Sequence, residues 1–340
     1  MSQRQQLHLL IQPKDRLSSL PEEVLEHIIS YLPTKDAVAT TFLSKTWKSQ
    51  SLWRSQMNLC FDDKTFPHPF SFSQFVHSVI TNRDNTLPIH SFHLKSHRGF
   101  CYSIDLYNFV YAAITLGVQN LSINLCSIRR TLPTFVLTTK TLSVLKLKEI
   151  SLNEMSYEDD PCFDLPSLKV LHLESVAFTF HKHIRKLLSA CPILEELETK
   201  DLTVKKVAKE LRINRDVPSL SNLVRANISG GYIGLDWLHN VHHLSIKLVD
   251  TFHNYADSEW KDPEIVPECL LSHLTTCSLR NYSHTNCEFQ FAKYIMENSR
   301  VLSTMTIQIA KSIESDTKIQ MLKELYLCPM NSATCELLLI

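Results

Sequence analysis

The sequence predicts an α/β protein in three successive parts: a short all-α N-terminal segment, an irregular solenoid of repeated strands, and a C-terminal α/β cap. Two Leu-Pro pairs punctuate short amphipathic runs near the N-terminus, apolar ladders recur through the middle, and helix-like and strand-like runs alternate towards the end. We expect a flexible tail at residues 1–14, the helical segment at 15–62, the repeats at 63–257 and the C-terminal region at 258–340, best defined over 259–310.

The composition is that of an ordinary globular protein, with 44% apolar and 21% charged residues. The 35 basic residues are balanced by 35 acidic ones, which weighs against nucleic acid as the main partner. The ten cysteines form no Cys-x-x-Cys pair, and neither a signal peptide nor a membrane span of about 18 apolar residues is evident. We therefore expect a cytoplasmic or nuclear protein that is not secreted and has no membrane partner.

The N-terminal segment predicts three short helices. Pro21 suits the start of the first, because its missing N–H costs nothing there, and two glutamates complement the helix dipole. Pro33 ends this helix, and Thr34 and Ser44 are expected to cap the second and third. A segment of about 45 residues buries too little surface alone, so its apolar stripe must dock on the rest of the chain, on another protein, or on both.

The stretch "DRLSSLPEEVLEHIISYLPTKDAVATTFLSKTW" (residues 15–47) resembles the F-box of plant proteins. The resemblance lies in the two Leu-Pro pairs, the acidic pair after the first of them, and the Leu-Ser-Lys that precedes the tryptophan. It implies binding to a Skp-type adaptor and, through it, to a cullin-RING ubiquitin ligase, with a helix inserted in a groove. The adaptor-binding residues that it implies are Leu20, Pro21, Val24, Leu25, Ile28, Leu32, Pro33, Val38, Leu43 and Trp47.

In the middle of the chain the template Leu-x-x-Leu-x-Leu recurs with substitutions. The second position of each unit falls at Phe92, Leu121, Leu145, Leu171 and Leu197, in steps of 24 to 29 residues. A looser unit follows around Leu244, and a degenerate one is expected between them near "LSNLVRANISGGYIG". Steps of this size are typical of leucine-rich repeats, in which each unit covers the core of its neighbours. The phrases "LLSACPILEELETKDL" and "LPSLKVLHLESVAF" also resemble plant F-box proteins with leucine-rich repeats.

Polar residues between the ladder leucines are expected to line the concave face of the solenoid, where solenoids bind their partners. We predict that this face captures an unknown protein substrate. The candidate residues are Asn120, Asn124, Lys146, Lys148, His172, Glu174, Glu196, Glu198, Lys200, His243 and Lys247. The alternative for each of them is an ordinary solvated surface position.

The C-terminal region predicts a strand in "HLTTCSLRNYS", a helix over about residues 288–298 and a buried strand in "VLSTMTIQI". The preceding Val-Pro-x-Cys-Leu and the late phrase "LYLCPMNSATCELLLI" make this region resemble the FBD domain of plant F-box proteins. The resemblance implies a segment that closes one end of the solenoid, because an exposed terminal repeat needs a cap.

No motif in the sequence indicates catalysis. The histidine clusters "HKHIRK" and "HNVHH" lack metal-ligand spacing, and only five glycines are available for phosphate-binding loops. We therefore predict a non-enzyme with no catalytic residues, no metal and no cofactor. The F-box resemblance implies that its role is that of the substrate-recognition adaptor of an SCF-type ligase.

Two alternatives remain open. One is a leucine-rich-repeat scaffold without ligase function, whose F-box has drifted. Thr46 stands where the F-box pattern has arginine, and Trp47 and Trp53 are two residues further apart than that pattern has them. The other alternative is a hydrolase that uses a cysteine or histidine of the concave face.

Overall fold

The computed structural model describes residues 17–98, 103–125, 130–152, 162–206, 220–230, 233–248, 262–263, 265–311, 313 and 315–340. The expected N-terminal tail and the acidic run "YEDDP" (157–161) lie outside these ranges. The chain divides into two compact units: unit one holds residues 1–96 and 100–118, and unit two holds residues 97–99 and 119–340. Within the described ranges, no helix combines the length and hydrophobicity that crossing a bilayer requires.

Unit one contains the three expected short helices and the first two repeat strands. Its helical part consists of α2 (Glu22–Ser30), α3 (Thr34–Ala39), η1 (Thr40–Phe42), α4 (Lys45–Gln50) and η2 (Leu52–Ser55). The remainder consists of β1 (Asn58–Asp62), η3 (Asp63–Thr65), α5 (Pro69–Asn82), β2 (Ser91–Ser96) and α6 (Ser103–Thr115). Strands β1 and β2 pair in parallel. The residues on either side of position 62 therefore belong to the same compact unit.

Of the two helix caps expected from the sequence, one is present in the structure and the other is not. Ser44 caps α4, as expected, and its hydroxyl accepts the N–H of Trp47 at 3.3 Å. Thr34 does not cap α3, because Pro33 occupies that position. The Thr34 side chain is fully buried, and its hydroxyl accepts the N–H of Cys60 in β1 at 2.8 Å. Thr34 thus links the helical segment to the first repeat strand.

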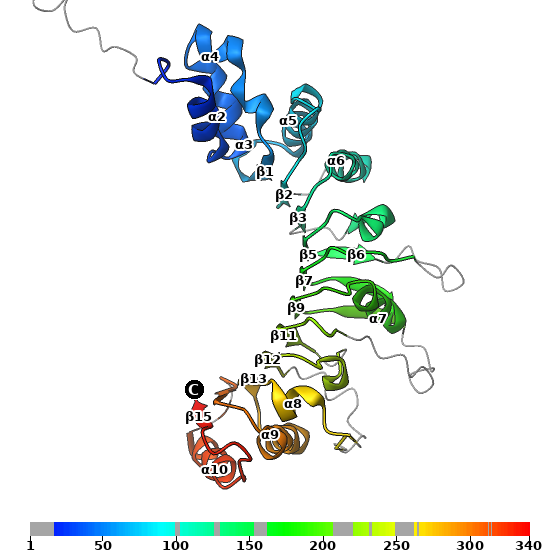
Figure 1. The fold of residues 1–340 in the computed structure, drawn as a ribbon, viewed down its shortest axis with the longest axis vertical. Coiled ribbons are helices and arrows are strands. Elements are labelled where there is room, and N and C mark those ends of the chain that lie inside the picture. Colours follow the sequence, from blue (N-terminus) through cyan, green and yellow to red (C-terminus); the bar gives the residue numbers. More distant parts are fainter. Residues whose placement is uncertain are drawn as a thin grey trace, which may run out of the picture. The chain divides into compact units, whose positions relative to one another are not determined.

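Unit two is built on one long parallel sheet. Its strands are β3 (Asn120–Leu125), β5 (Val144–Lys148), β7 (Val170–Glu174), β9 (Glu196–Lys200), β11 (Arg225–Ser229), β12 (His243–Lys247), β13 (Thr276–Tyr282), β14 (Thr304–Ile309) and β15 (Glu336–Leu339), in that spatial order. The sheet curves, and helices α7 (His181–Ser189), α8 (Glu268–Ser272), α9 (Asn286–Asn298) and α10 (Ser315–Tyr326) lie on its outer side (Figure 1). The open concave side is called the inner face below.

The ladder leucines set the register of this sheet. Leu121 pairs with Leu145, which pairs with Leu171, which in turn pairs with Leu197, and all four are fully buried. The degenerate unit expected near "LSNLVRANIS" is confirmed as β11, where Ala226 takes the ladder position beside Leu197. Alternate side chains of a strand point to opposite faces, so the residues between the ladder positions lie on the inner face.

A second, four-stranded parallel sheet was not anticipated. It consists of β4 (Arg130–Thr131), β6 (Ile150–Leu152), β8 (Ala177–Phe180) and β10 (Thr203–Lys206). The chain reaches the last three of these strands through Glu149, Ser175 and Asp201, each of which has a positive φ of 51° to 57°. These left-handed residues stand directly after β5, β7 and β9, so the same turn recurs in three successive repeats.

The C-terminal region continues the long sheet as β13, β14 and β15, with α9 and α10 between them. This confirms the expected strand, helix and strand. Helix α9 begins two residues earlier than expected, because Thr285 and Glu288 form a capping box. The Thr285 hydroxyl accepts the Glu288 N–H at 3.3 Å, and the Glu288 carboxylate accepts the Thr285 N–H at 3.1 Å.

Candidate protein-interaction surfaces

Helix α2 carries two apolar stripes that lie about 100° apart around its axis. Leu25 and Ile29 are each only 1% exposed and pack into unit one. Val24 and Ile28, one residue earlier on each turn, are 41% and 37% exposed. The inner stripe anchors the helix, because burying two large aliphatic side chains stabilises the unit by roughly 3–6 kcal/mol. The outer stripe is therefore presented on a fixed support.

The outer stripe continues through the Leu-Pro pair that precedes the helix. Leu20 is 36% exposed, and Pro21 is also exposed. We call Leu20, Pro21, Val24 and Ile28 the outer face. Of the other residues that the F-box resemblance implied, Pro33 and Leu43 are exposed, Leu32 and Val38 are half-buried, and Leu25 and Trp47 are buried. Leu25 and Trp47 thus support the helices from inside and do not contribute to the exposed surface.

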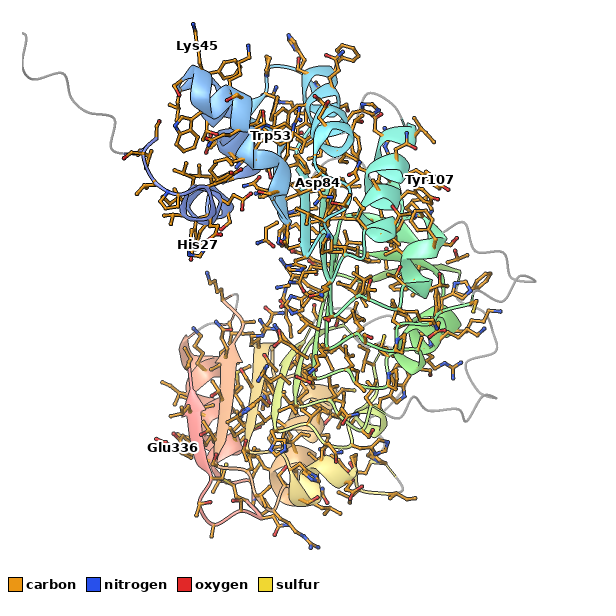
Figure 2. All side chains as sticks on the ribbon, turned by 45° about the horizontal axis from the view of Figure 1, so that its top comes forward. His27, Lys45, Trp53, Asp84, Tyr107 and Glu336 are labelled. Atoms are coloured by element: carbon orange, nitrogen blue, oxygen red, sulfur yellow. The ribbon has the colours of Figure 1, made fainter. Side chains whose placement is uncertain are left out.

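The unusual spacing between Trp47 and Trp53 is accommodated by a turn. Ser51 adopts a left-handed conformation, with a φ of 46°, and ends α4. Helix η2 then begins at once and buries Leu52 and Trp53; Figure 2 shows Trp53 among the helices of unit one. Trp47 is also buried, and its indole Nε1 donates to the Ser18 hydroxyl at 2.8 Å. The extra residues therefore leave both tryptophans in the core, while the Thr46 side chain lies outside the described residues.

The end of α2 is tied to the rest of unit one by a buried glutamine. Gln56 is 4% exposed, and its Nε2 donates to the carbonyls of Ile29 at 2.9 Å and Leu32 at 3.3 Å. These carbonyls belong to the last turn of α2 and the residues after it, and the Ile29 carbonyl also accepts the Leu32 N–H at 2.9 Å. Arg83 in turn donates to the Gln56 carbonyl at 3.3 Å. The helical segment and the first repeat are therefore joined by hydrogen bonds as well as by apolar contacts.

The inner face of unit two contains a shallow hollow of about 190 Å³ over β3, β5, β7 and β9. Its lining brings together seven of the residues predicted to contact a substrate. They are Asn124, Lys146, Lys148, His172, Glu174, Glu198 and Lys200, with Ser122 and three ladder residues between them. Their convergence follows from the sheet register, which places Lys146, His172 and Glu198 side by side on successive strands.

Glu174 is the centre of an ion-pair cluster in this hollow. Its carboxylate lies 2.5 Å from the Lys200 Nζ and 2.9 Å from the Lys148 Nζ. Hydrogen bonds from Lys200 and then Lys148 hold the pKa of Glu174 below its usual range. The two lysines flank Glu174 because the register pairs residues 148, 174 and 200 across three strands.

A second cluster surrounds Glu196. His172 Nε2 lies 2.8 Å from one of its carboxylate oxygens, and Arg225 Nε donates to the other at 3.1 Å. The hydrogen bond with His172, followed by that with Arg225, lowers the pKa of Glu196. His172 Nδ1 also lies 3.6 Å from the Glu198 carboxylate. The part of the inner face over β3, β5, β7 and β9 is thus polar, hydrogen-bonded and nearly balanced in charge.

The remaining predicted residues lie outside the hollow. Asn120 starts β3, and His243 and Lys247 are the first and last residues of β12. His243 Nδ1 lies 2.8 Å from the Thr276 hydroxyl of β13. Sequence reasoning missed Arg225 and Arg280, which also lie on the inner face. The signal for Arg225 was the degenerate repeat, and the signal for Arg280 was the strand expected in "HLTTCSLRNYS". The inner-face positions of both strands follow once their register with β12 is known.

We predict that the Glu174 cluster makes stability depend on pH on the acid side. A carboxyl group whose pKa is lowered by folding stabilises the protein above its unfolded pKa of about 4.3, and this contribution is lost as the pH falls through the folded value. Between pH 7 and pH 3, the wild type should lose more unfolding free energy than Glu174→Gln, by at most about 1 kcal/mol because the cluster is partly exposed.

Urea unfolding at the two pH values measures this difference. Glu336→Gln is the matched control, because the exposed Glu336 side chain has no hydrogen-bond or ion-pair partner among the described residues. An equal acid-side loss in wild type and Glu174→Gln would show that the cluster contributes nothing to stability.

Three buried cysteines, Cys191, Cys269 and Cys277, do not have the properties of nucleophiles. Burial raises the pKa of Cys191 and of Cys277 to about 12, and that of Cys269 to about 11. A cysteine nucleophile needs a lowered pKa, because the thiolate is the reactive form. Cys191 is a core residue of its repeat, as expected, and its thiol donates to the Leu187 carbonyl at 3.2 Å.

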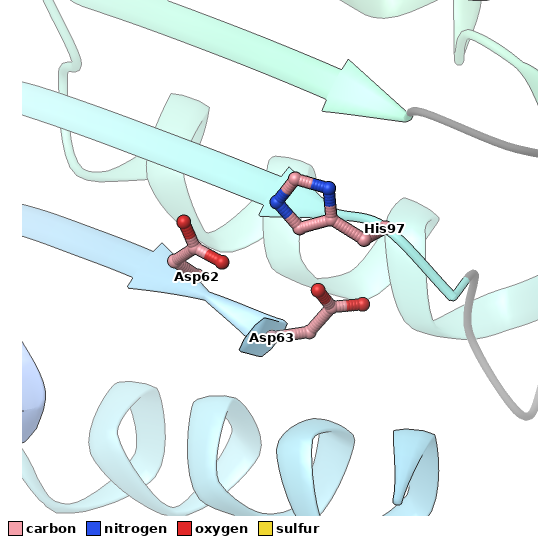
Figure 3. Close-up of side chains that lie close together, drawn as sticks. All are labelled: Asp62, Asp63 and His97. Atoms are coloured by element: carbon pink, nitrogen blue, oxygen red, sulfur yellow. The ribbon is translucent and has the colours of Figure 1, made fainter. Parts of the chain in front are cut away.

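Two adjacent carboxylates, Asp62 at the end of β1 and Asp63 at the start of η3, are drawn in Figure 3. Each of them has partners in unit one. Asp63 is buried and accepts the Ser96 hydroxyl at 3.0 Å. Asp62 accepts the Lys64 N–H at 2.9 Å and lies 3.8 Å from the Lys95 Nζ. His97, which is also drawn, belongs to unit two. These partners give both carboxylates a structural role at the turn into η3.

The fold and its surfaces define a class of protein. Along the chain, a helical segment with an exposed apolar face on a fixed support precedes a repeat body with a polar inner face. Comparison with known families agrees. Residues 17–56 match the F-box domain, residues 110–228 match the repeats described as "FBD-associated F-box protein At5g56370, LRR repeats", and residues 262–307 match FBD.

Curated relatives from Arabidopsis thaliana have names that refer to the same kinds of segment. The chain is 28% identical to F-box/FBD/LRR-repeat protein At4g26340 and 29% identical to FBD-associated F-box protein At5g56370, in each case over 95% of this chain and 99% of the relative. It is 35% identical to F-box/LRR-repeat protein At4g14103 over 56% of this chain and 50% of that protein. The chain thus carries F-box, leucine-rich-repeat and FBD segments in the order expected, and these matches indicate an F-box adaptor protein.

Proposed function

We propose that this protein is the substrate-recognition adaptor of an SCF-type cullin-RING ubiquitin ligase. In this role the outer face of unit one binds a Skp-type adaptor, and the inner face of unit two binds a protein substrate. The protein catalyses nothing itself. It raises the effective concentration of the ligase near the substrate by holding both at once.

The outer face is the observation that carries the proposal. Large aliphatic side chains at i and i+4 on an exposed helix face fit a groove-binding mode. Complete burial of such a side chain contributes roughly 1.5–3 kcal/mol, and Leu20, Val24 and Ile28 have only 36–41% of their surface left to bury. Association costs about 4–15 kcal/mol, so tight binding needs further contacts. Phe42 and Leu43, which are 86% and 63% exposed, are available for these.

The inner face supports the second half of the proposal. Its hollow collects charged and amide side chains from four strands on a rigid sheet, which suits hydrogen bonding to a polar partner. The described cysteines whose pKa departs from the ordinary value are all shifted upward, and such thiols favour a binding role over hydrolysis.

Capture by an immobilised Skp-type adaptor tests the proposal. We expect the wild-type chain to be retained, and Leu20→Ala with Pro21→Ala to bind about tenfold more weakly or worse, because two central contacts are truncated. Phe70→Ala is the matched control, since Phe70 is 47% exposed on α5, outside the F-box match. If the wild type is not retained at micromolar protein, a repeat scaffold without ligase function becomes the better account.

A further inference from the structure

The inner face of unit two changes in chemistry between β9 and β11. Strands β7 and β9 place three glutamates on it, each beside a basic side chain or a histidine. The next four strands, β11 to β14, contain no aspartate and no glutamate. Their inner-face positions hold arginine, lysine, histidine and uncharged polar residues. Apart from Arg225, which pairs with Glu196 of β9, this half of the inner face presents positive charge that no carboxylate of the described residues compensates.

Lys247 and Arg280 are the centre of this region. They are directly paired neighbours on β12 and β13. Among the described residues, Lys247 has no hydrogen-bond or ion-pair partner, and Arg280 has no carboxylate partner. Like charges placed opposite each other on adjacent strands repel and destabilise a sheet. An anion bound between or above the two cations would relieve this repulsion.

The Arg280 side chain is held in place across β12. Its Nη2 donates to the Asn227 side chain on β11, two strands away, so the guanidinium lies over β12. Two contacts fix the backbone beneath it: the Leu248 N–H donates to the Arg280 carbonyl at 2.8 Å, and Asn281 Nδ2 donates to the Leu248 carbonyl at 2.9 Å. The Arg280 Nε is buried and has no acceptor among the described residues.

Ser229 supplies a further unsatisfied group in the same row. It pairs with Lys247 in the register of β11 and β12, and strand alternation places it on the inner face with Arg225 and Asn227. Ser229 is only 4% exposed, yet its hydroxyl has no hydrogen-bond partner in the described part of the chain. Buried donors without acceptors are costly and uncommon, and they indicate a missing partner.

We propose that Ser229, Lys247 and Arg280 form an anion-binding subsite that takes a carboxylate from an acidic segment of the substrate protein. This deepens, and rests on, the proposed use of the inner face for substrate capture. A carboxylate accepts hydrogen bonds at both oxygens, so it can compensate the two cations and accept from the serine hydroxyl together. The neighbouring row of Ser245, Ser278 and Thr306 offers hydroxyls for the backbone of the bound segment.

Fluorescence anisotropy of the full chain with a labelled glutamate-rich peptide tests this subsite. We expect the wild type to bind, and Lys247→Gln with Arg280→Gln to weaken binding about tenfold or more, because two charge-assisted contacts are lost. Ser229→Ala should weaken it about threefold, the size of one neutral hydrogen bond. Lys323→Gln is the matched control, since the Lys323 side chain is exposed on α10, on the outer side of the sheet, and has no hydrogen-bond or ion-pair partner among the described residues. It should change binding by less than about twofold.

Three results would overturn the assignment. The first is an absence of peptide binding by the wild type, and the second is an equal loss in the Lys323→Gln control, which would show a non-specific charge effect. The third is much tighter binding of a phosphoserine version of the peptide, or of inorganic phosphate, which would assign the subsite to a phosphoryl group instead of a carboxylate.

A folding control keeps the test independent of stability. Because Lys247→Gln and Ser229→Ala remove only a repelling cation or an unsatisfied hydroxyl, these ligand-free single variants should unfold thermally no earlier than the wild type. Arg280→Gln also removes the hydrogen bond to Asn227, so the double variant is compared with the wild type by its own unfolding curve. The peptide should raise the unfolding temperature of the wild type more than that of the double variant. Adaptor capture by the variants should be unchanged. Peptide binding without adaptor capture would contradict the proposed ligase role only, and adaptor capture without a peptide response would contradict the subsite only.

Discussion

Val24→Asp together with Ile28→Asp is expected to weaken binding to a Skp-type adaptor by about 100-fold or more, which corresponds to about 2.7 kcal/mol. Both side chains lie on the exposed stripe of α2, so the substitutions would place two carboxylates in a groove that is proposed to be apolar. Burying an uncompensated charge is costly, and the loss should therefore exceed that of truncation to alanine. Isothermal titration calorimetry with the purified adaptor measures the effect.

The same double variant should fold as well as the wild type. Exposed positions outside a network usually change stability by no more than about 0.5 kcal/mol. Equal unfolding midpoints in urea, with lost adaptor binding, would assign the effect to the interface. Unchanged adaptor affinity in the folded variant would remove the outer face from the binding site.

Leu25→Ala is expected to do the opposite: to lower the stability of unit one and to leave adaptor affinity nearly unchanged. Leu25 is 1% exposed in the core of unit one, and truncating a buried leucine costs about 2–5 kcal/mol through lost contacts and a cavity. We expect a large drop in the unfolding free energy of unit one, measured by urea denaturation followed through tryptophan fluorescence. Both Trp47 and Trp53 are buried in this unit and report on its packing.

Leu25→Met is the control for this prediction, because a swap that conserves volume usually costs less than about 1.5 kcal/mol. Under conditions where Leu25→Ala remains folded, its adaptor affinity should stay within about threefold of the wild type, since Leu25 is not exposed to a partner. A stable Leu25→Ala variant that has lost adaptor binding would mean that Leu25 turns outward in the complex.

The repeat body could be predicted from the sequence because its signal is long-range and regular. Leu121, Leu145, Leu171 and Leu197 recur at nearly equal steps, and the structure pairs them in register. The second sheet could not be predicted in the same way. Its strands β6 and β8 are three and four residues long and buried throughout, so they show no alternation. The turns that lead into it use Glu149, Ser175 and Asp201 rather than glycine, which hides them.

The candidate surfaces were predicted in part. Spacing alone placed Val24, Leu25 and Ile28 on one stripe, whereas packing divides them between an outward and an inward one. The sequence cannot show this division, because it depends on where η2 and β1 dock. The pairing of Glu174 with Lys148 and Lys200 follows directly from the repeat step. The sequence could not place Lys247 beside Arg280, because that pairing depends on the register of strands that follow a degenerate repeat.

The most direct test of the account is size-exclusion chromatography with light scattering on the full chain mixed with a Skp-type adaptor at micromolar concentration. We predict a single complex whose mass equals one copy of each protein, and its loss with the Val24→Asp and Ile28→Asp double variant. Separate elution of the folded wild-type chain and the adaptor would contradict the central claim that the outer face of unit one joins this protein to a ubiquitin ligase.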